Sequence, residues 1–158
     1  MKKVKKAMPK RGKRRRGAEP TVSTTMRLRS SVREDLEAWA ARARRSVSDL
    51  AQELIEEGIR MRECPGIYFA TEPSGRTAKV AGTGLGVWEI LRDFVTNQDV
   101  ARVREAFPRL SQSQVTAALL YYNRFSEEIR REIDANAALT PEALERRYPG
   151  LVQTVRAG

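Results

Sequence analysis

Three side chains suited to recognition chemistry lie close together near the N-terminus, at Thr25, Arg27 and Arg29. They alternate with Met26 and Leu28, so an extended backbone places the polar side chains on one face and the apolar ones on the other. Two such segments paired in an antiparallel ribbon fit the major groove of DNA, where arginine can pair with guanine and threonine can contact base edges. We therefore predict that these three residues read DNA bases. The alternative is a solvated edge strand whose charges protect it from aggregation.

A dense run of basic residues precedes this segment. Residues 1–20 hold ten lysines and arginines against one glutamate, a net charge of +9 out of the chain's +10. Because the run has few apolar residues, it predicts a flexible cationic arm. In a eukaryotic source, residues 13–16 could serve as a nuclear localisation signal. Otherwise we expect the arm to bind DNA phosphates, through Lys10, Arg11, Lys13, Arg14, Arg15 and Arg16.

The composition excludes several classes of enzyme. The chain contains no histidine and a single cysteine, Cys64. Ser-His-Asp and Cys-His catalysis and the histidine zinc motifs therefore lack a required residue, and no disulfide can form within the chain. We interpret Cys64 as an inert linker residue. Five acids that a nuclease could use to bind a metal are interpreted as solvated helix faces: Asp93, Asp99, Glu127, Glu128 and Asp134.

The glycines at positions 82, 84 and 86 do not form a nucleotide-binding loop. Their spacing departs from the dinucleotide fingerprint, and no Gly-Lys-Ser or Gly-Lys-Thr sequence is present. We interpret them as turn glycines before a helix. Together with the composition, this predicts a protein that is not an enzyme, with no catalytic residue, metal, cofactor or small-molecule substrate.

Nothing in the sequence predicts a membrane segment. The longest uninterrupted apolar run, residues 117–122, is far shorter than the roughly 18 residues of a membrane span. The residues that follow the basic run are polar, whereas a signal peptide has an apolar stretch there. We expect a cytoplasmic, nucleoid-associated protein.

Residues 21–62 have the pattern of a strand followed by two helices. A capping box at Ser31 and Glu34 predicts the start of the first helix, and Ser46 with Asp49 predicts the start of the second. Both helices carry an apolar stripe, and Trp39 in the first is interpreted as core or boundary packing, as is a second tryptophan at position 88. The free amides at the start of the second helix suit a phosphate, contacted by Ser46, Val47 and Ser48.

These residues cannot complete a fold alone. A single strand leaves its backbone groups unpaired, and about forty residues are close to the lower limit for an independent domain. Pairing of the strands of two copies, with their helical stripes buried together, solves both problems. The segment therefore predicts a homodimer.

Residues 63–134 predict a small hairpin and three helices. The hairpin joins residues 67–70 to 77–80, and the helices begin after Gly86, near Val100 and at Ser111. The cap at Gly86 is unusual because glycine has no capping side chain. The third helix is expected to run to about residue 133. Its apolar residues form either a thick core or a partner surface, for which we select Leu120, Tyr121, Phe125, Ile129 and Ile133.

Two parts of the chain resemble known families. Residues 24–29, 31–36 and 46–58 resemble the ribbon-helix-helix repressors of the CopG and Arc type. Residues 66–69, 81–90, 106–111 and 117–122 resemble a small helix-turn-helix-like domain of unknown function, number 433, found in VapB-type antitoxins. The resemblance implies an operator-binding dimer fused to a domain that engages a toxin, often a PIN-like ribonuclease. The basic arm belongs to neither motif.

The predicted fold is mainly α and has four parts. A disordered basic arm (1–20) precedes a dimeric ribbon-helix-helix domain with one strand and two helices (21–62). A hairpin plus three-helix, helix-turn-helix-like domain (63–134) and a short helix with a tail (135–158) follow.

The predicted function is that of a type II antitoxin. Its homodimer represses its own operon at a palindromic operator in double-stranded DNA and also binds and neutralises a cognate toxin protein. The alternatives are a stand-alone repressor, a plasmid or nucleoid protein without a toxin, and an RNA-binding module.

Overall fold

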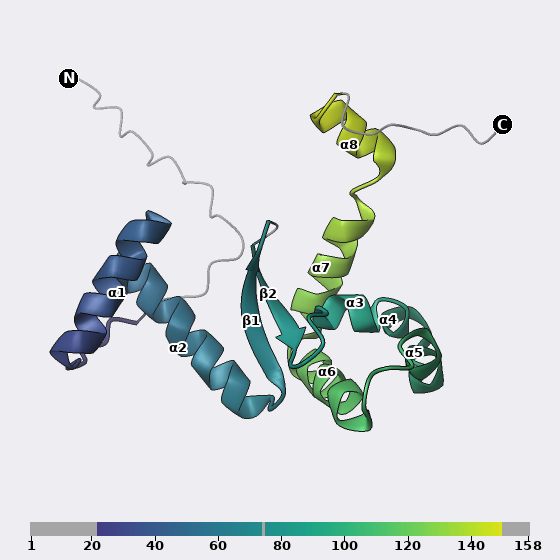
Figure 1. Ribbon diagram of the computed structural model, residues 1–158, viewed down its shortest axis with the longest axis horizontal. Coiled ribbons are helices and arrows are strands. Elements are labelled where there is room, and N and C mark those ends of the chain that lie inside the picture. The colour runs from purple at the N-terminus through teal and green to yellow at the C-terminus, as the bar shows by residue number, and fades with distance from the viewer. Residues whose placement is uncertain (1–21, 74, 150–158) are drawn as a thin grey trace, which may run out of the picture.

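The computed structural model describes residues 22–73 and 75–149 and is mainly helical, as predicted (Figure 1). A helical pair, a two-stranded hairpin and a group of short helices follow one another along the chain. The basic arm and the C-terminal tail, predicted at 1–20 and beyond about residue 148, lie almost entirely outside the described residues. The elements are α1 (Ser30–Ala43), α2 (Val47–Glu63), β1 (Ile67–Glu72), β2 (Gly75–Val80), α3 (Val87–Leu91), α4 (Phe94–Asn97), α5 (Val100–Ala106), α6 (Gln112–Arg124), α7 (Ser126–Ala137) and α8 (Pro141–Arg147).

The start of α1 differs from the prediction. The helix begins at Ser30, one residue before the expected cap, and its N-cap is Arg29, whose side chain makes no capping hydrogen bond. Ser31 is therefore inside the first turn, where its hydroxyl cannot cap the helix. The capping box expected at Ser31 and Glu34 was wrong.

Most other helix starts follow from local sequence. The Ser46 hydroxyl accepts a hydrogen bond from the Asp49 amide at 3.0 Å, which confirms the predicted cap of α2. Ser111 and Gln114 form a reciprocal capping box at α6, and the Thr140 hydroxyl caps α8 with Pro141 at its first position. These caps join residues three positions apart, so the sequence alone is sufficient to predict them.

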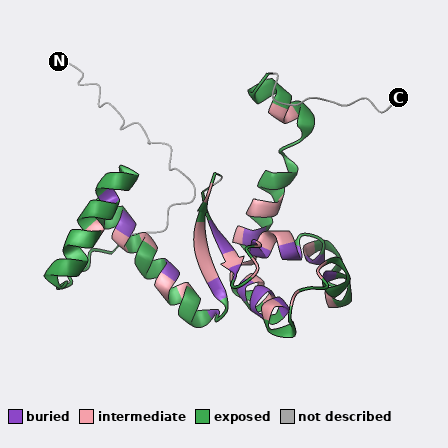
Figure 2. Ribbon diagram, viewed as in Figure 1, coloured by how far each residue is buried: buried purple, intermediate pink, exposed green. Residues whose placement is uncertain are grey.

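The helical pair α1 and α2 has almost no closed core of its own. Ala40 and Leu50 are buried where the two helices meet, whereas the apolar residues of both stripes remain exposed (Figure 2). Trp39, expected to be core or boundary, is 60% exposed. No other part of residues 22–73 and 75–149 covers these side chains, so the predicted stripes form an open apolar surface.

The predicted hairpin is present: β1 pairs with β2 in antiparallel register, with Ile67 opposite Val80. Both strands are longer than the predicted runs 67–70 and 77–80, so that Glu72 pairs with Gly75. Gly66 leads into it with a φ of +91°, a conformation that side chains disfavour. A Cβ at this position would lie 3.1 Å from the Ala117 Cβ of α6. The glycine thus lets the hairpin approach α6 closely.

The glycine-rich loop before α3 is a turn, as interpreted from the sequence. Gly82 and Gly84 have φ angles of +77° and +72°. Gly86 is the N-cap of α3, and in place of a capping side chain its own amide donates to the Glu89 carboxylate at 2.5 Å. Glycine is therefore compatible with this cap, because the Glu89 half of a capping box comes from inside the helix.

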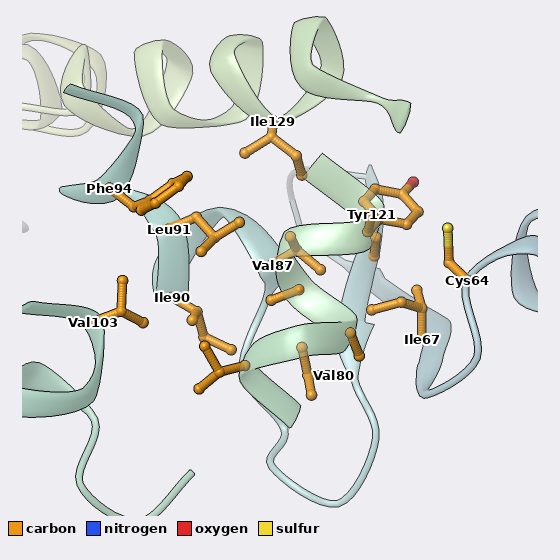
Figure 3. Packing of buried hydrophobic residues seen from close by; sticks show 14 residues of the cluster. Cys64, Ile67, Val80, Val87, Ile90, Leu91, Phe94, Val103, Tyr121 and Ile129 are labelled. Carbon is orange, nitrogen blue, oxygen red and sulfur yellow. The ribbon is translucent and has the colours of Figure 1, made fainter. Parts of the chain in front are cut away.

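The hydrophobic core lies between the hairpin, α3, α6 and α7 (Figure 3). Tyr121, Ile90, Leu91 and Ile129 are its largest fully buried side chains. Cys64 is also part of it and is 2% exposed, so its interpretation as a linker residue was wrong. Burial raises the pKa of the Cys64 thiol, which makes it a poor nucleophile.

The long third helix expected to run from Ser111 to about residue 133 is two helices. The chain leaves the helical conformation at Phe125, with φ −127° and ψ 42°, and α7 begins at Ser126. Tyr121 and Ile129, on either side of the break, both lie in the core. The domain boundary expected at 134 falls inside α7, and the expected three helices are five between α3 and α7.

Among the described residues, no helix is both long enough and apolar enough to span a membrane.

Candidate nucleic-acid interface

Residues 22–29, the described segment before α1, contain no helix or strand in the single chain. Thr25, Arg27 and Arg29 are exposed, while Met26 and Leu28 line an apolar groove on the helical pair. The alternation of polar and apolar faces expected from the sequence is thus present. A strand needs a neighbour for its backbone hydrogen bonds, so formation of the ribbon by a second copy remains a prediction.

The apolar groove has a volume of about 330 Å³ and is formed by the segment before α1, α1 and α2. Only one of its residues, Asp35, is charged. Several of its side chains are large and more than 40% exposed, among them Trp39, Leu54 and Ile55. The complete lining is Met26, Leu28, Val32, Asp35, Leu36, Trp39, Ala51, Leu54 and Ile55.

The start of α2 is suited to bind an anion. The Asp49 amide donates its hydrogen bond to the Ser46 hydroxyl. For the amides of Val47 and Ser48, the described residues provide no acceptor. Val47 and Ser48 are exposed. The first-turn amides of a helix attract phosphate, so the predicted contact by residues 46–48 is compatible with this geometry. The other predicted phosphate contacts, in residues 10–16, lie outside the described residues.

A set of ion pairs joins the second half of α2 to the hairpin and to α6 and α7. The Arg76 guanidinium donates to both carboxylate oxygens of Glu57, at 2.8 and 2.6 Å. Arg60 contacts Glu128 at 2.6 Å, and Arg124 makes two contacts with Glu63. Two-point arginine–carboxylate pairs fix orientation as well as distance, so they hold α2 in a defined position against the rest of the molecule.

The Arg60 pair extends to a buried tyrosine. The Tyr121 hydroxyl donates to the Glu128 carboxylate at 2.6 Å and accepts from Arg60 at 3.1 Å. Burial, followed by the hydrogen bond to Glu128, raises the pKa of Tyr121. Glu128 was interpreted as part of a solvated helix face, which was wrong, because its partners lie on α2 and α6. In the sequence, Glu127 and Glu128 show only that acidic residues suited to a first helical turn are present. They do not identify the partners of Glu128.

The predicted partner surface is mostly buried. Tyr121 and Ile129 are 0% exposed, and Phe125 and Ile133 are half-buried against the core. Only Leu120 remains exposed, at 51%. Tyr121 and Ile129 are therefore core residues, and their selection as toxin contacts was wrong for this conformation. Burial decides against them because a contact residue must be accessible to its partner.

This difference between neighbouring residues is testable by stability. Ile129→Ala is expected to lower the free energy of unfolding by about 2 to 5 kcal/mol, because it opens a cavity in the core. Leu120→Ala, the control at an exposed position, should change it by less than about 0.5 kcal/mol. Urea unfolding of the full chain measures both values. Equal effects of the two substitutions would contradict the assignment of Ile129 to the core.

Within residues 22–73 and 75–149, no group of three histidine, cysteine, aspartate or glutamate side chains is arranged to hold a metal ion.

Comparison with known families identifies two segments. Residues 30–63 match the family described as "CopG-like RHH_1 or ribbon-helix-helix domain, RHH_5", and residues 73–122 match "Protein of unknown function (DUF433)". A search of curated proteins and a search of solved structures found no match. The two family matches confirm the predicted fusion of a ribbon-helix-helix domain with a DUF433 domain, in that order. The chain thus contains a domain typical of DNA-binding regulators rather than of enzymes.

Proposed function

We propose that this chain, a ribbon-helix-helix domain joined to a DUF433 domain, is the antitoxin of a type II toxin–antitoxin system. Two copies bind a palindromic operator and repress transcription of their own operon. The DUF433 domain binds the toxin. Support for the first half comes from the geometry of the helical pair, and support for the second from the resemblance to VapB-type antitoxins.

The uncovered apolar groove is the observation that carries the DNA-binding part. It places Met26 and Leu28 beside the exposed stripes of α1 and α2 and leaves Arg27 and Arg29 outside its lining. A second copy that buries this groove brings the two extended segments together as a ribbon. The same step aligns Thr25, Arg27 and Arg29 of both copies on one cationic face, which suits the major groove.

Phosphate contacts complete the DNA-binding surface. The amides of Val47 and Ser48 would hold one backbone phosphate on each side of the operator, and the basic arm would add contacts that do not depend on sequence. In this division of roles, the ribbon supplies selectivity and the arm supplies affinity.

The contribution of the arm is measurable by its salt dependence. Each neutralised phosphate contributes about −0.9 to the slope of log K against log salt concentration. Deletion of residues 1–20 is expected to flatten this slope by several units and leave the preferred sequence unchanged. A full-length variant controls for chain length. It carries glutamine in place of the six basic residues Lys10, Arg11, Lys13, Arg14, Arg15 and Arg16. An unchanged slope in both variants would exclude the arm from DNA binding.

Co-expression with the product of the adjacent reading frame tests the antitoxin role. We expect the two proteins to purify together and the complex to suppress the toxicity of the neighbour expressed alone. Absence of a toxic neighbour, or failure of the two proteins to associate, would refute the toxin-binding half. The DNA-binding half is tested separately by the arginine substitutions described in the Discussion.

The second candidate is a stand-alone ribbon-helix-helix repressor. The burial of Tyr121 and Ile129 favours it, because it removes two of the five residues selected for toxin contact. A stand-alone repressor would bind its operator with the same affinity whether or not the neighbouring protein is present. The antitoxin would show a change in operator affinity when its partner is added.

A further inference from the structure

A second cavity, of about 520 Å³, lies between the later turns of α2, the hairpin, α3 and α7, and it shares no residue with the apolar groove. We call it the α2–α7 cleft. Its walls combine charged side chains from α2 and α7 with an apolar part that includes Phe69, Trp88 and Leu139. A cavity of this size with a few polar groups on an apolar surface is typical of binding sites.

The charges around the α2–α7 cleft do not balance. Its lining contains five carboxylates and three guanidinium groups. Glu57 and Glu128 are paired with Arg76 and Arg60, at 2.6 Å in both cases.

The remaining lining groups also have partners, with one exception. Glu53 contacts Arg45 at 2.6 Å from outside the lining, and Glu56 accepts a hydrogen bond from the Gln52 amide at 2.8 Å. The third guanidinium, that of Arg131, donates to the backbone carbonyl of Glu127 at 3.3 Å. The carboxylate left without a hydrogen-bond partner is that of Glu132.

Glu132 lines the cleft, and one oxygen of its carboxylate is buried and unsatisfied beneath the surface. Its Oε2 atom is buried and has no hydrogen-bond partner among the described residues. Burial, followed by the nearby charge of Glu128, raises the pKa of this carboxyl group to about 7. The charge of the neighbouring Arg131 offsets only part of this effect, and Arg131 makes no hydrogen bond to Glu132, so a further cation brought close to the ionised carboxylate would be stabilised.

We propose that the α2–α7 cleft binds one arginine or lysine side chain of a partner polypeptide, with the cationic group facing Glu132. When Arg45, the partner of Glu53, is counted with the three guanidinium groups of the lining, the five carboxylates exceed the positive charges by one, which matches one side chain. The apolar wall at Phe69, Trp88 and Leu139 matches the methylene stem and an adjacent apolar residue. This wall also favours a peptide over a small free amine, which would leave it uncovered.

The cleft site has a defined pH dependence. The charged groups that share the cleft with Glu132 are Glu53, Glu56, Glu57 and Arg60 from α2, Arg76 from the hairpin, and Glu128 and Arg131 from α7; of these, Glu128 and Arg131 act on its pKa. A bound cation favours the ionised form of Glu132 and lowers its pKa. Affinity therefore falls as the pH drops below about 7, approaching tenfold per pH unit, and becomes constant above it.

Nuclear magnetic resonance of the full-length chain tests this site through the indole N–H of Trp88, assigned by its loss in Trp88→Phe. The probe is the peptide acetyl-Leu-Arg-Leu-amide, and the neutral counterpart carries norleucine in place of arginine. We expect the arginine peptide to shift the Trp88 resonance and the norleucine peptide to bind at least tenfold more weakly. The affinity of the arginine peptide should show the pH dependence described above.

The variant Glu132→Gln keeps the shape of the side chain, removes the buried charge and is expected to lower the affinity of the arginine peptide at least tenfold at pH 8. Glu127→Gln changes an exposed residue of the same helix outside the cleft and should have no effect. Spectra of both variants that retain the core resonances establish that the fold is intact. Equal binding of the two peptides, or unchanged affinity in Glu132→Gln, would overturn the proposal. Agmatine binding as tightly as the peptide would also overturn it, in favour of a free-amine site.

Discussion

Alanine at both Arg27 and Arg29 is expected to lower affinity for the operator by at least 100-fold and to remove the preference for it over random DNA. A bidentate contact between arginine and guanine contributes about 1 to 3 kcal/mol of discrimination, and a dimer makes each contact twice. The duplex is one that the wild-type chain selects from a random-sequence library. Fluorescence anisotropy at a fixed salt concentration measures both affinities.

The control for this double substitution removes the same charge elsewhere. Arg104 on α5 and Arg146 on α8 are exposed and lie in the second half of the chain. Alanine at these two positions should weaken binding to all DNA sequences slightly and equally, with the operator preference intact. If the Arg27 and Arg29 variant keeps its selectivity, the extended segment does not read bases.

Leu28→Asp is expected to convert the dimer into a monomer at micromolar concentration. Leu28 lines the apolar groove and is 44% exposed in the single chain, so a partner would cover it. An aspartate there would bury an unpaired charge in each copy, which is strongly unfavourable. Because residue 28 precedes α1, the substitution leaves the helices and the main core untouched. Sedimentation velocity should give a mass near 17.9 kDa for the variant and twice that for the wild type.

The matched control is Val22→Asp, in the same extended segment. Val22 is 87% exposed and does not line the groove, so this variant should remain a dimer. Loss of the dimer in both variants would indicate that charge on the segment, rather than its position in the groove, controls assembly. A wild-type chain that sediments as a monomer would refute the dimer itself.

The sequence predicts those parts of the fold that depend on neighbouring residues. The caps at Ser46, Ser111 and Thr140 and the hairpin register follow from patterns a few residues long. The open apolar groove also follows from sequence, because the stripes of α1 and α2 have too little chain around them to be covered. The dimer is expected, and the groove is exposed, for the same reason: the chain around α1 and α2 is too short to cover their apolar stripes.

The break at Phe125 could not be predicted from its own residues. No glycine or proline marks it, and Tyr121, Phe125 and Ile129 have the spacing of one continuous helical stripe. The break follows from tertiary packing. The Phe125 ring lies 4.7 Å from the Tyr121 ring and contacts the Arg60 guanidinium at 4.5 Å.

The connections between the two halves of the molecule were also beyond sequence reasoning. Arg60 is 61 residues from Tyr121 and 68 from Glu128. Each of these side chains, taken alone, has the pattern of a solvated helix face or an apolar stripe. Only the folded arrangement shows that α2 serves both the groove and the α2–α7 cleft, through different residues of the same turns.

Hydrogen exchange of the backbone amides of residues 23–28, in the purified full-length chain, tests most directly whether two copies pair their extended segments. In the single chain these amides have no backbone hydrogen-bond partner among residues 22–73 and 75–149. An antiparallel ribbon protects every second amide, because alternate amides point toward the partner strand. We predict alternating protection in the wild type and its loss in Leu28→Asp. Rapid exchange of all six amides in the wild type would contradict the ribbon and the DNA-reading surface that depends on it.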